Sequence, residues 1–233
     1  MASLEGLRLK ILKYLRTNKK LVKKRTALLI NKEYTIISNN CWGGMIDESY
    51  ELTKRSPTTG LFFVADDYIK FLTNLKGYLS GKLEFIEPGN SKWKDLPEIS
   101  NDVRFGDYPI GILSNGNDVI EIFFLHYHND LEARDKWERR CKRINWNKLI
   151  IKFNDQNCCE EKHVAAFAML PFKNKLFFTC KRWMNENEYK SKIGKGYCLI
   201  NQWLNYESIT ASHEPFGKSK YINITEFINQ IEN

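Results

Sequence analysis

An apolar run that stops abruptly at small polar residues is the clearest pattern along the chain. Residues 34–37 have the composition of a buried strand, and residues 38–44 continue as Ser-Asn-Asn-Cys-Trp-Gly-Gly. The pattern predicts a strand followed by a loop at its carboxyl end. In open α/β sheets, ligands bind at that edge. This segment is therefore the first candidate for a functional site.

The rest of the pattern predicts alternating strands and helices. An Asn-Gly pair at residues 115–116 lies between two apolar runs, which is typical of a β-hairpin, and Asp66 or Asp67 is expected to cap a helix. The chain therefore favours a three-layer α/β/α sandwich with a mixed sheet, as a single domain over residues 33–233. Further strands are expected at residues 61–65, 83–86, 109–113, 119–127, 149–153, 176–179 and 221–224. Helices are expected after Asp66 or Asp67, with apolar positions between residues 69 and 79, and at 130–144 (capped by Asp130), 163–170, 199–206 and 226–231 (capped by Thr225).

Basic residues are concentrated at the start of the chain. Residues 1–32 hold ten Lys or Arg and one acidic residue, whereas the other 201 residues hold 26 basic and 27 acidic side chains. Apolar residues recur there near helical spacing, at Leu4, Leu7, Ile11, Tyr14 or Leu15, and Val22. This spacing predicts a basic amphipathic helix over roughly residues 3–25 within an arm over residues 1–32. Two interpretations stay open for residues 1–25: a helix packed on the domain, or attachment to an anionic membrane surface. A partner nucleic acid is not indicated, because the basic charge does not extend over the domain.

Composition narrows the class of protein. The 233 residues are 42% hydrophobic, which is typical of a globular chain. No stretch reaches the roughly 18 apolar residues that span a bilayer, and the N-terminus lacks an apolar signal core. We therefore expect a cytoplasmic protein, with a place on the inner face of the membrane as the alternative. The six cysteines form no C-x-x-C pair, which argues against a zinc knuckle or a disulfide framework, and no pattern identifies a cofactor.

Cys41 is a candidate nucleophile at the end of the first strand. A reactive thiol needs a lowered pKa, supplied by a neighbouring His or a helix N-terminus. Gly43 allows tight backbone beside it, and Asn39 and Asn40 have amides that could stabilise an oxyanion or bind a sugar hydroxyl. The alternative is that Cys41 is a small buried residue at a strand end.

Two histidines follow the expected strand at residues 119–127. His126 and His128 would point the same way in an extended strand, and Asp130 follows them. Three interpretations stay open: a general base paired with Cys41, a metal site of His126, His128 and Asp130, or imidazoles with ordinary hydrogen bonds.

The expected helix at residues 130–144 carries a basic run. Arg140 and Arg143 share a helix face with Lys136, and Arg139 flanks it. Guanidinium groups so placed suit a phosphate or pyrophosphate. The alternative is a solvated face balanced by neighbouring acidic residues.

Seven short motifs lie along the chain from about residue 30 to the C-terminal helix. They are Ile-Ile-Ser-Asn-Asn-Cys-Trp-Gly-Gly at residues 36–44, Ser-Pro-Thr-Thr-Gly-Leu-Phe-Phe at 56–63, Asp-Tyr-Ile-Lys-Phe-Leu at 67–72, Tyr-Pro-Ile-Gly at 108–111, Phe-Leu-His-Tyr at 124–127, Trp-Glu-Arg-Arg at 137–140 and Arg-Ile-Asn at 143–145. Together they resemble a bacterial family whose members are often labelled exopolysaccharide or capsular polysaccharide biosynthesis proteins. The resemblance implies an α/β/α sandwich and a role in surface glycans, and it favours His126 over His128.

Three functional hypotheses follow. The first is a transferase, of acyl or similar groups, acting on a glycan or lipid-linked sugar, with Cys41 and His126 as catalytic residues. The second is a non-catalytic protein that binds a glycan or lipid carrier, and the third is a metal-dependent hydrolase. The candidate residues for binding a glycan or a phosphate-bearing sugar are Ser38, Asn39, Asn40, Trp42, Gly43, Arg139, Arg140 and Arg143.

Overall fold

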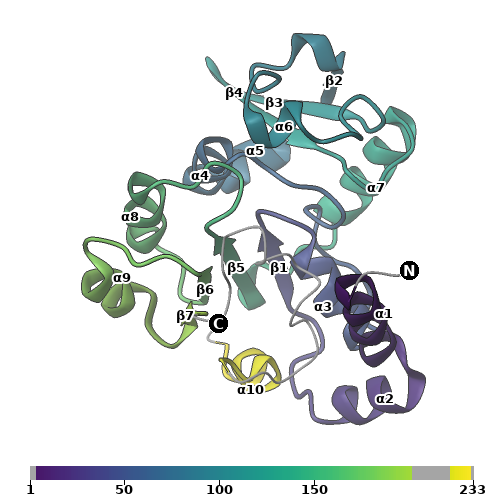
Figure 1. Ribbon diagram of the computed structural model, residues 1–233, viewed down its shortest axis with the longest axis vertical. Coiled ribbons are helices and arrows are strands. Elements are labelled where there is room, and N and C mark those ends of the chain that lie inside the picture. Colours follow the sequence, from purple (N-terminus) through teal and green to yellow (C-terminus); the bar gives the residue numbers. More distant parts are fainter. Residues whose placement is uncertain (1–3, 201–220, 232–233) are drawn as a thin grey trace.

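A four-stranded parallel sheet lies at the centre of the fold. The computed structural model describes residues 4–200 and 221–231. The strands of this sheet follow the order β1-β5-β6-β7, and all three pairings are parallel. The carboxyl ends of these strands therefore meet at one edge (Figure 1). The strands are β1 (Thr35–Ser38), β5 (Leu149–Asn154), β6 (Lys175–Thr179) and β7 (Tyr197–Leu199).

Helices cover both faces of this sheet, which confirms the α/β architecture. Successive side chains of a strand point to opposite faces, so Ile37 and Ile151 join one apolar core while Ile36 and Ile150 join the other. The first core is closed by α4, α8 and α9, and the second by α3 and α10 (Figure 1). These helices are α3 (Trp42–Ser49), α4 (Ala65–Thr73), α8 (Glu161–Met169), α9 (Glu186–Ile193) and α10 (Ile224–Asn229).

A second sheet is inserted between β1 and β5. Its strands β2, β3 and β4 are antiparallel, and Gly116 takes a positive φ at the predicted hairpin. The sequence pattern predicts these strands within one mixed sheet, but among the described residues the outer edge of β4 pairs with Phe62 alone, through a single bridge to Phe123. The inserted elements are β2 (Glu84–Ile86), β3 (Ile110–Asn115), β4 (Asp118–Phe123), α5 (Leu75–Ser80), α6 (Pro97–Ser100), α7 (Asp130–Cys141) and the short 3-10 turns Pro88–Asn90 and Trp146–Lys148; a third such turn is Gly194–Gly196.

The basic N-terminal segment forms two helices instead of one. They are α1 (Leu4–Thr17) and α2 (Lys19–Ala27), divided at Asn18, whose side chain accepts from the amides of Lys20 and Leu21. Arg16 Nε donates to Glu48 at 2.7 Å, and Arg25 Nε donates to the Ser49 carbonyl at 3.0 Å. Both helices are thereby held on α3. Among the described helices, none combines the length and the apolar character that crossing a bilayer requires.

Some predicted elements differ from the structure. Residues 61–65 form a buried connection with one isolated bridge, and the strand expected at 119–127 ends at Phe123. Residues 221–224 lead directly into α10. Asn129 and Asn223 cap α7 and α10 in place of the expected Asp130 and Thr225. The helix expected at residues 199–206 lies largely outside the described residues.

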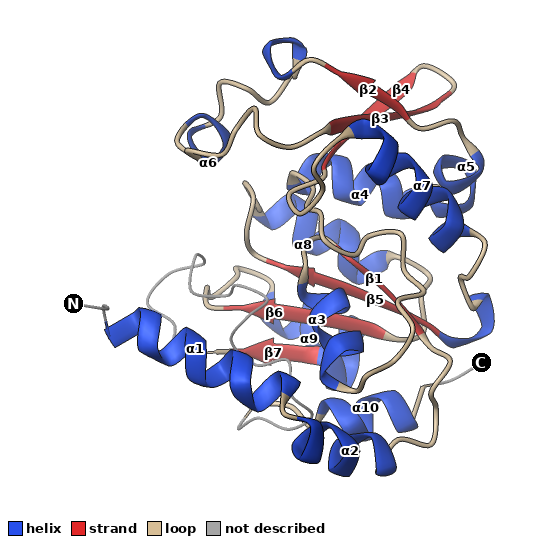
Figure 2. Ribbon diagram, turned by 90° about the vertical axis from the view of Figure 1, so that its right-hand side faces the viewer, coloured by secondary structure: helices blue, strands red, loops and turns tan. Residues whose placement is uncertain are grey.

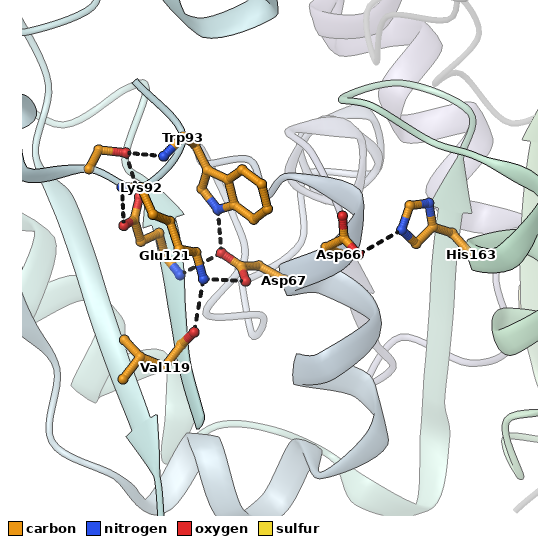
Figure 3. A network of polar contacts seen from close by, with 8 residues as sticks. Asp66, Asp67, Lys92, Trp93, Val119, Glu121 and His163 are labelled. Carbon is orange, nitrogen blue, oxygen red and sulfur yellow. Dashed lines mark hydrogen bonds and ion pairs between the residues drawn. The ribbon is translucent and has the colours of Figure 1, made fainter. Parts of the chain in front are cut away.

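The two adjacent aspartates of α4 serve different elements (Figure 3). Val64 occupies the N-cap, so neither aspartate caps the helix as predicted. Asp66 pairs with His163 Nε2 at 3.1 Å. The fully buried Asp67 accepts from Trp93 Nε1 at 2.6 Å and Lys92 Nζ at 2.7 Å. This network ties the loop between β2 and β3 to α4.

Candidate functional site

A buried lysine lies at the carboxyl edge of the parallel sheet. Lys152 of β5 is 1% exposed, and its register partner in β1 is Ser38. Its Nζ donates to the side-chain oxygen of Asn40 at 2.9 Å and of Asn39 at 3.1 Å. The loop predicted to be a site therefore surrounds a cation from the neighbouring strand.

Asn40 connects this lysine to its surroundings. Its oxygen also accepts from the Ser38 hydroxyl at 3.3 Å and from the Trp42 amide at 3.2 Å, while its nitrogen donates to Gln156 Oε1 at 2.9 Å. Asn154 donates to the same Gln156 oxygen at 2.7 Å. We call Asn39, Asn40, Lys152, Asn154 and Gln156 the Lys152 cluster. Four of its five members are neutral amides, which can both donate to and accept from hydroxyl groups.

The electrostatics of Lys152 are unusual for a lysine. Burial lowers the pKa of its ammonium well below the ordinary value, although the charges of Asp155 and Cys41 oppose that effect. The ammonium also lies 5.9 Å from the centre of the Trp42 ring. Of its three donor positions, two bind Asn39 and Asn40. A buried lysine with only neutral partners is costly to keep charged, and such perturbed groups concentrate at functional sites.

Asp155 follows Lys152 along the same edge. One of its carboxylate oxygens accepts from the Thr179 hydroxyl at 2.6 Å and the Cys180 amide at 2.9 Å, and the other is buried without a hydrogen-bond partner among the residues that the structure describes. Burial raises the pKa of this carboxyl. Asp155 lines a cavity of about 200 Å³ together with Glu98, Cys158, Cys159, Glu160 and Lys181. We call this space the Asp155 cavity.

The loop beside the cavity has an uncommon backbone. Asn157 and Cys158 both have positive φ, at 55° and 63°. Non-glycine residues in this region carry strain that the surroundings must hold in place. Asn157 is held by its side-chain bond to the Phe63 carbonyl at 3.0 Å and by its own carbonyl, which accepts from the Ala65 amide.

Cys41 lies at the N-cap of α3 and is partly buried. Its Sγ contacts the Leu61 carbonyl at 3.8 Å. Burial raises the pKa of the thiol to about 11, even though Lys152 opposes that rise. No hydrogen bond joins Cys41 to His126, both of which lie in the described part of the chain. Its catalytic role stays a prediction.

His126 lies in the loop after β4, and its backbone amide donates to the Gly60 carbonyl at 3.0 Å. Desolvation and the charges of Arg104 and Lys54 lower the pKa of its imidazole. Because the strand ends at Phe123, the extended geometry expected for His126 and His128 is wrong. Among the residues that the structure describes, no three His, Cys, Asp or Glu side chains gather as metal ligands would.

The three arginines do not form one open face. Arg140 is buried, and its guanidinium donates to the Tyr127 hydroxyl and to the Thr59 carbonyl. Lys136 lies over the same Tyr127 ring. Lys136 and Arg140 thus share a side of α7 as predicted, but that side packs on Tyr127, and Arg143 lies beyond the end of the helix at Cys141. Arg139 and Arg143 are exposed.

Glycines let α3 approach the site closely. A side chain at Gly43 would lie 3.1 Å from Ile36, and one at Gly44 would lie 2.5 Å from Thr59. Gly43 therefore has a packing role, which places the Trp42 amide next to Asn40. The N-terminus of α3 is positioned by this contact.

Comparison with known proteins identifies a family without assigning a function. A family model described as a domain of unknown function, DUF1919, matches residues 11–229. The chain belongs to the DUF1919 family. A protein of Haemophilus influenzae named "Uncharacterized protein" is 33% identical over 153 residues. That match covers 66% of this chain and 65% of the relative, so the chain spans just under two thirds of the relative's length.

In this DUF1919 chain, the sequence pattern singles out one side of the Lys152 cluster and not the other. Ser38, Asn39, Asn40 and Trp42 were expected at the site, and all lie around Lys152. Lys152 and Asp155 were not singled out. The sequence does offer one signal. A lysine lies within the apolar run at residues 149–153, and that lysine must be buried if the run forms a central strand.

Proposed function

We propose that this DUF1919 chain is a transferase of surface-polysaccharide assembly, which acts on a glycan or a lipid-linked sugar at the Lys152 cluster. The observation that carries the proposal is the buried ammonium of Lys152, held by Asn39 and Asn40 beside the carboxylate of Asp155. The resemblance to polysaccharide biosynthesis proteins is the reason for proposing surface-polysaccharide assembly as the pathway.

The chemistry of the cluster supports a sugar substrate. Amide groups match the paired donor and acceptor character of sugar hydroxyls. Lys152 supplies a positive charge for a phosphate, and the free oxygen of Asp155 can accept from a hydroxyl. A substrate with both hydroxyls and phosphate would give Lys152 a counter-charge and the Asp155 oxygen a hydrogen-bond donor.

The transfer step uses Asp155 as base. The acceptor hydroxyl gives its proton to the Asp155 carboxylate while its oxygen bonds to the transferred group. The bond from that group to the phosphate of the donor breaks, and its electron pair stays on the phosphate. Lys152 stabilises the charge that develops there.

Binding of glucose 1-phosphate tests the site. We expect calorimetry to detect binding by the wild type and at least tenfold weaker binding by Lys152→Met. Lys175→Met is the matched control, because Lys175 is also a buried lysine but binds the carbonyls of Ala168 and Leu170 at the end of α8. Glucose and inorganic phosphate, tested separately, show which half of the probe is recognised. Equal binding by wild type and Lys152→Met, or none by either, would overturn the proposal.

A second candidate function is a non-catalytic glycan-binding protein. The raised pKa of the Cys41 thiol and its lack of a bond to His126 favour this alternative over a thiolate enzyme. Asp155→Asn separates the two candidates in cells. A transferase loses polymer modification while glucose 1-phosphate binding changes only a few-fold, whereas a binding protein keeps both.

A further inference from the structure

An apolar stripe runs along the outer side of α1. Leu7, Ile11 and Tyr14 are 53%, 51% and 61% exposed. Their spacing of four and three residues places them on one side of the helix. Scattered exposed apolar residues are ordinary, but three in register on one helix form a continuous surface.

The opposite side of α1 is fixed on the domain. Arg16 is 7% exposed, and its guanidinium binds Glu48 and the Met45 sulfur. Arg25 of α2 donates to the carbonyls of Leu15 and Arg16 at the end of α1. Figure 2 shows α1 at the periphery of the molecule. The stripe is therefore an outward surface of the folded chain.

Basic side chains accompany the stripe. Lys10 and Lys13 are exposed on α1, and Lys19, Lys20, Lys23 and Lys24 are exposed on α2. Residues 1–32 carry a net charge of +9, whereas the rest of the chain is close to neutral. Charge of one sign beside an apolar stripe is complementary to a surface that is both anionic and apolar.

We propose that α1 lies in the headgroup region of an anionic lipid bilayer, with Leu7, Ile11 and Tyr14 inserted and Lys10 and Lys13 on phosphates. Such a helix lies in the plane of the interface, and tyrosine suits the headgroup level because its ring is apolar and its hydroxyl polar. A nucleic acid would engage the lysines but would leave the stripe exposed. This inference is independent of the Lys152 cluster.

Vesicle flotation with the full chain tests the proposal. We expect the wild type to bind phosphatidylcholine vesicles containing about one third phosphatidylglycerol far better than pure phosphatidylcholine, and to dissociate as salt rises. Lys10→Gln with Lys13→Gln should weaken partitioning roughly 30-fold. The exposed pair Lys70→Gln with Lys142→Gln removes the same charge elsewhere and should change it less than about twofold.

The stripe has its own matched pair of variants. Ile11→Glu should weaken partitioning at least tenfold, whereas Leu131→Glu, at a 68% exposed position on α7, should leave it unchanged. Thermal unfolding and glucose 1-phosphate binding should be unaffected in both. Wild-type partitioning of Ile11→Glu, equal binding to neutral and anionic vesicles, or binding to RNA but not to vesicles would overturn the inference.

Discussion

The ammonium nitrogen of Lys152 lies 2.9 Å from the side-chain oxygen of Asn40, 112 residues earlier in the chain. The parallel pairing of β1 and β5 creates this contact, because it places Ser38 opposite Lys152 and turns the following loop over the lysine. Asn40 is a neutral amide, so it does not balance the charge of Lys152. The buried ammonium should therefore lower the stability of the fold while serving the proposed function, and denaturation of variants can measure that cost.

Replacing the two buried lysines should affect stability in opposite directions. Since burial lowers the pKa of Lys152, keeping its ammonium charged in the folded chain costs stability. We expect Lys152→Met to unfold at an equal or higher denaturant concentration than the wild type. Lys175→Met should lose about 1–2 kcal/mol with its two carbonyl bonds. Strong destabilisation by Lys152→Met would show that the lysine serves the fold instead of a ligand.

The thiol of Cys41 should react slowly at neutral pH. Its pKa is raised to about 11 by burial, and Lys152 opposes the rise. The rate of alkylation by iodoacetamide, followed by mass spectrometry of the Cys41 peptide, should still be climbing at pH 10. Cys141, whose pKa is about 12, serves as the internal control. A plateau for Cys41 near pH 7 would instead support the thiolate hypothesis.

The sequence pattern predicts some strands correctly and misplaces others, and the reason is physical. The run at residues 34–37 was recognised because a polar loop follows it directly. The run at residues 61–65 has similar composition and is buried, yet only Phe62 makes a strand-like bridge. Apolar composition reports burial, and pairing with a neighbour is what makes a strand. Phe124 and Tyr127 likewise stay buried beyond the end of β4, which is why His126 was placed on a strand.

The candidate site also has one part that the sequence pattern indicates and another that it does not. Ser38, Asn39 and Asn40 are adjacent in sequence, so their local pattern could be recognised. Lys152 and Asp155 join them only through the pairing of β1 with β5, which local periodicity does not reveal. Arg140 shows the converse: helical spacing predicted its face correctly but could not show that Tyr127 covers it.

The paired aspartates of α4 should differ in their contribution to stability. Asp67 is fully buried and binds Lys92, Trp93 and the Glu121 amide, so Asp67→Ala leaves three donors without their acceptor. We expect a loss of about 2–4 kcal/mol in the free energy of unfolding. Asp66→Ala removes a partly exposed partner of His163 and should cost about 1 kcal/mol or less. Chemical denaturation of both variants measures the difference, and equal losses would contradict the anchoring role of Asp67.

Asp47 of α3 should make the protein less stable as pH rises. Burial raises its pKa to about 8, although the charge of Lys54 opposes the rise. Between its unfolded pKa near 3.9 and pH 8, the folded chain keeps a proton that the unfolded chain loses, so stability falls with pH by about 1.4 kcal/mol per unit at most. Asp47→Asn removes this dependence. Its stability relative to the wild type should therefore increase steadily from pH 5 to pH 8 and level off above. Glu48→Gln, the same charge change at the exposed neighbouring position, should shift stability by less than about 1 kcal/mol across that range. Parallel curves for wild type and Asp47→Asn would mean that Asp47 is ionised in the folded protein.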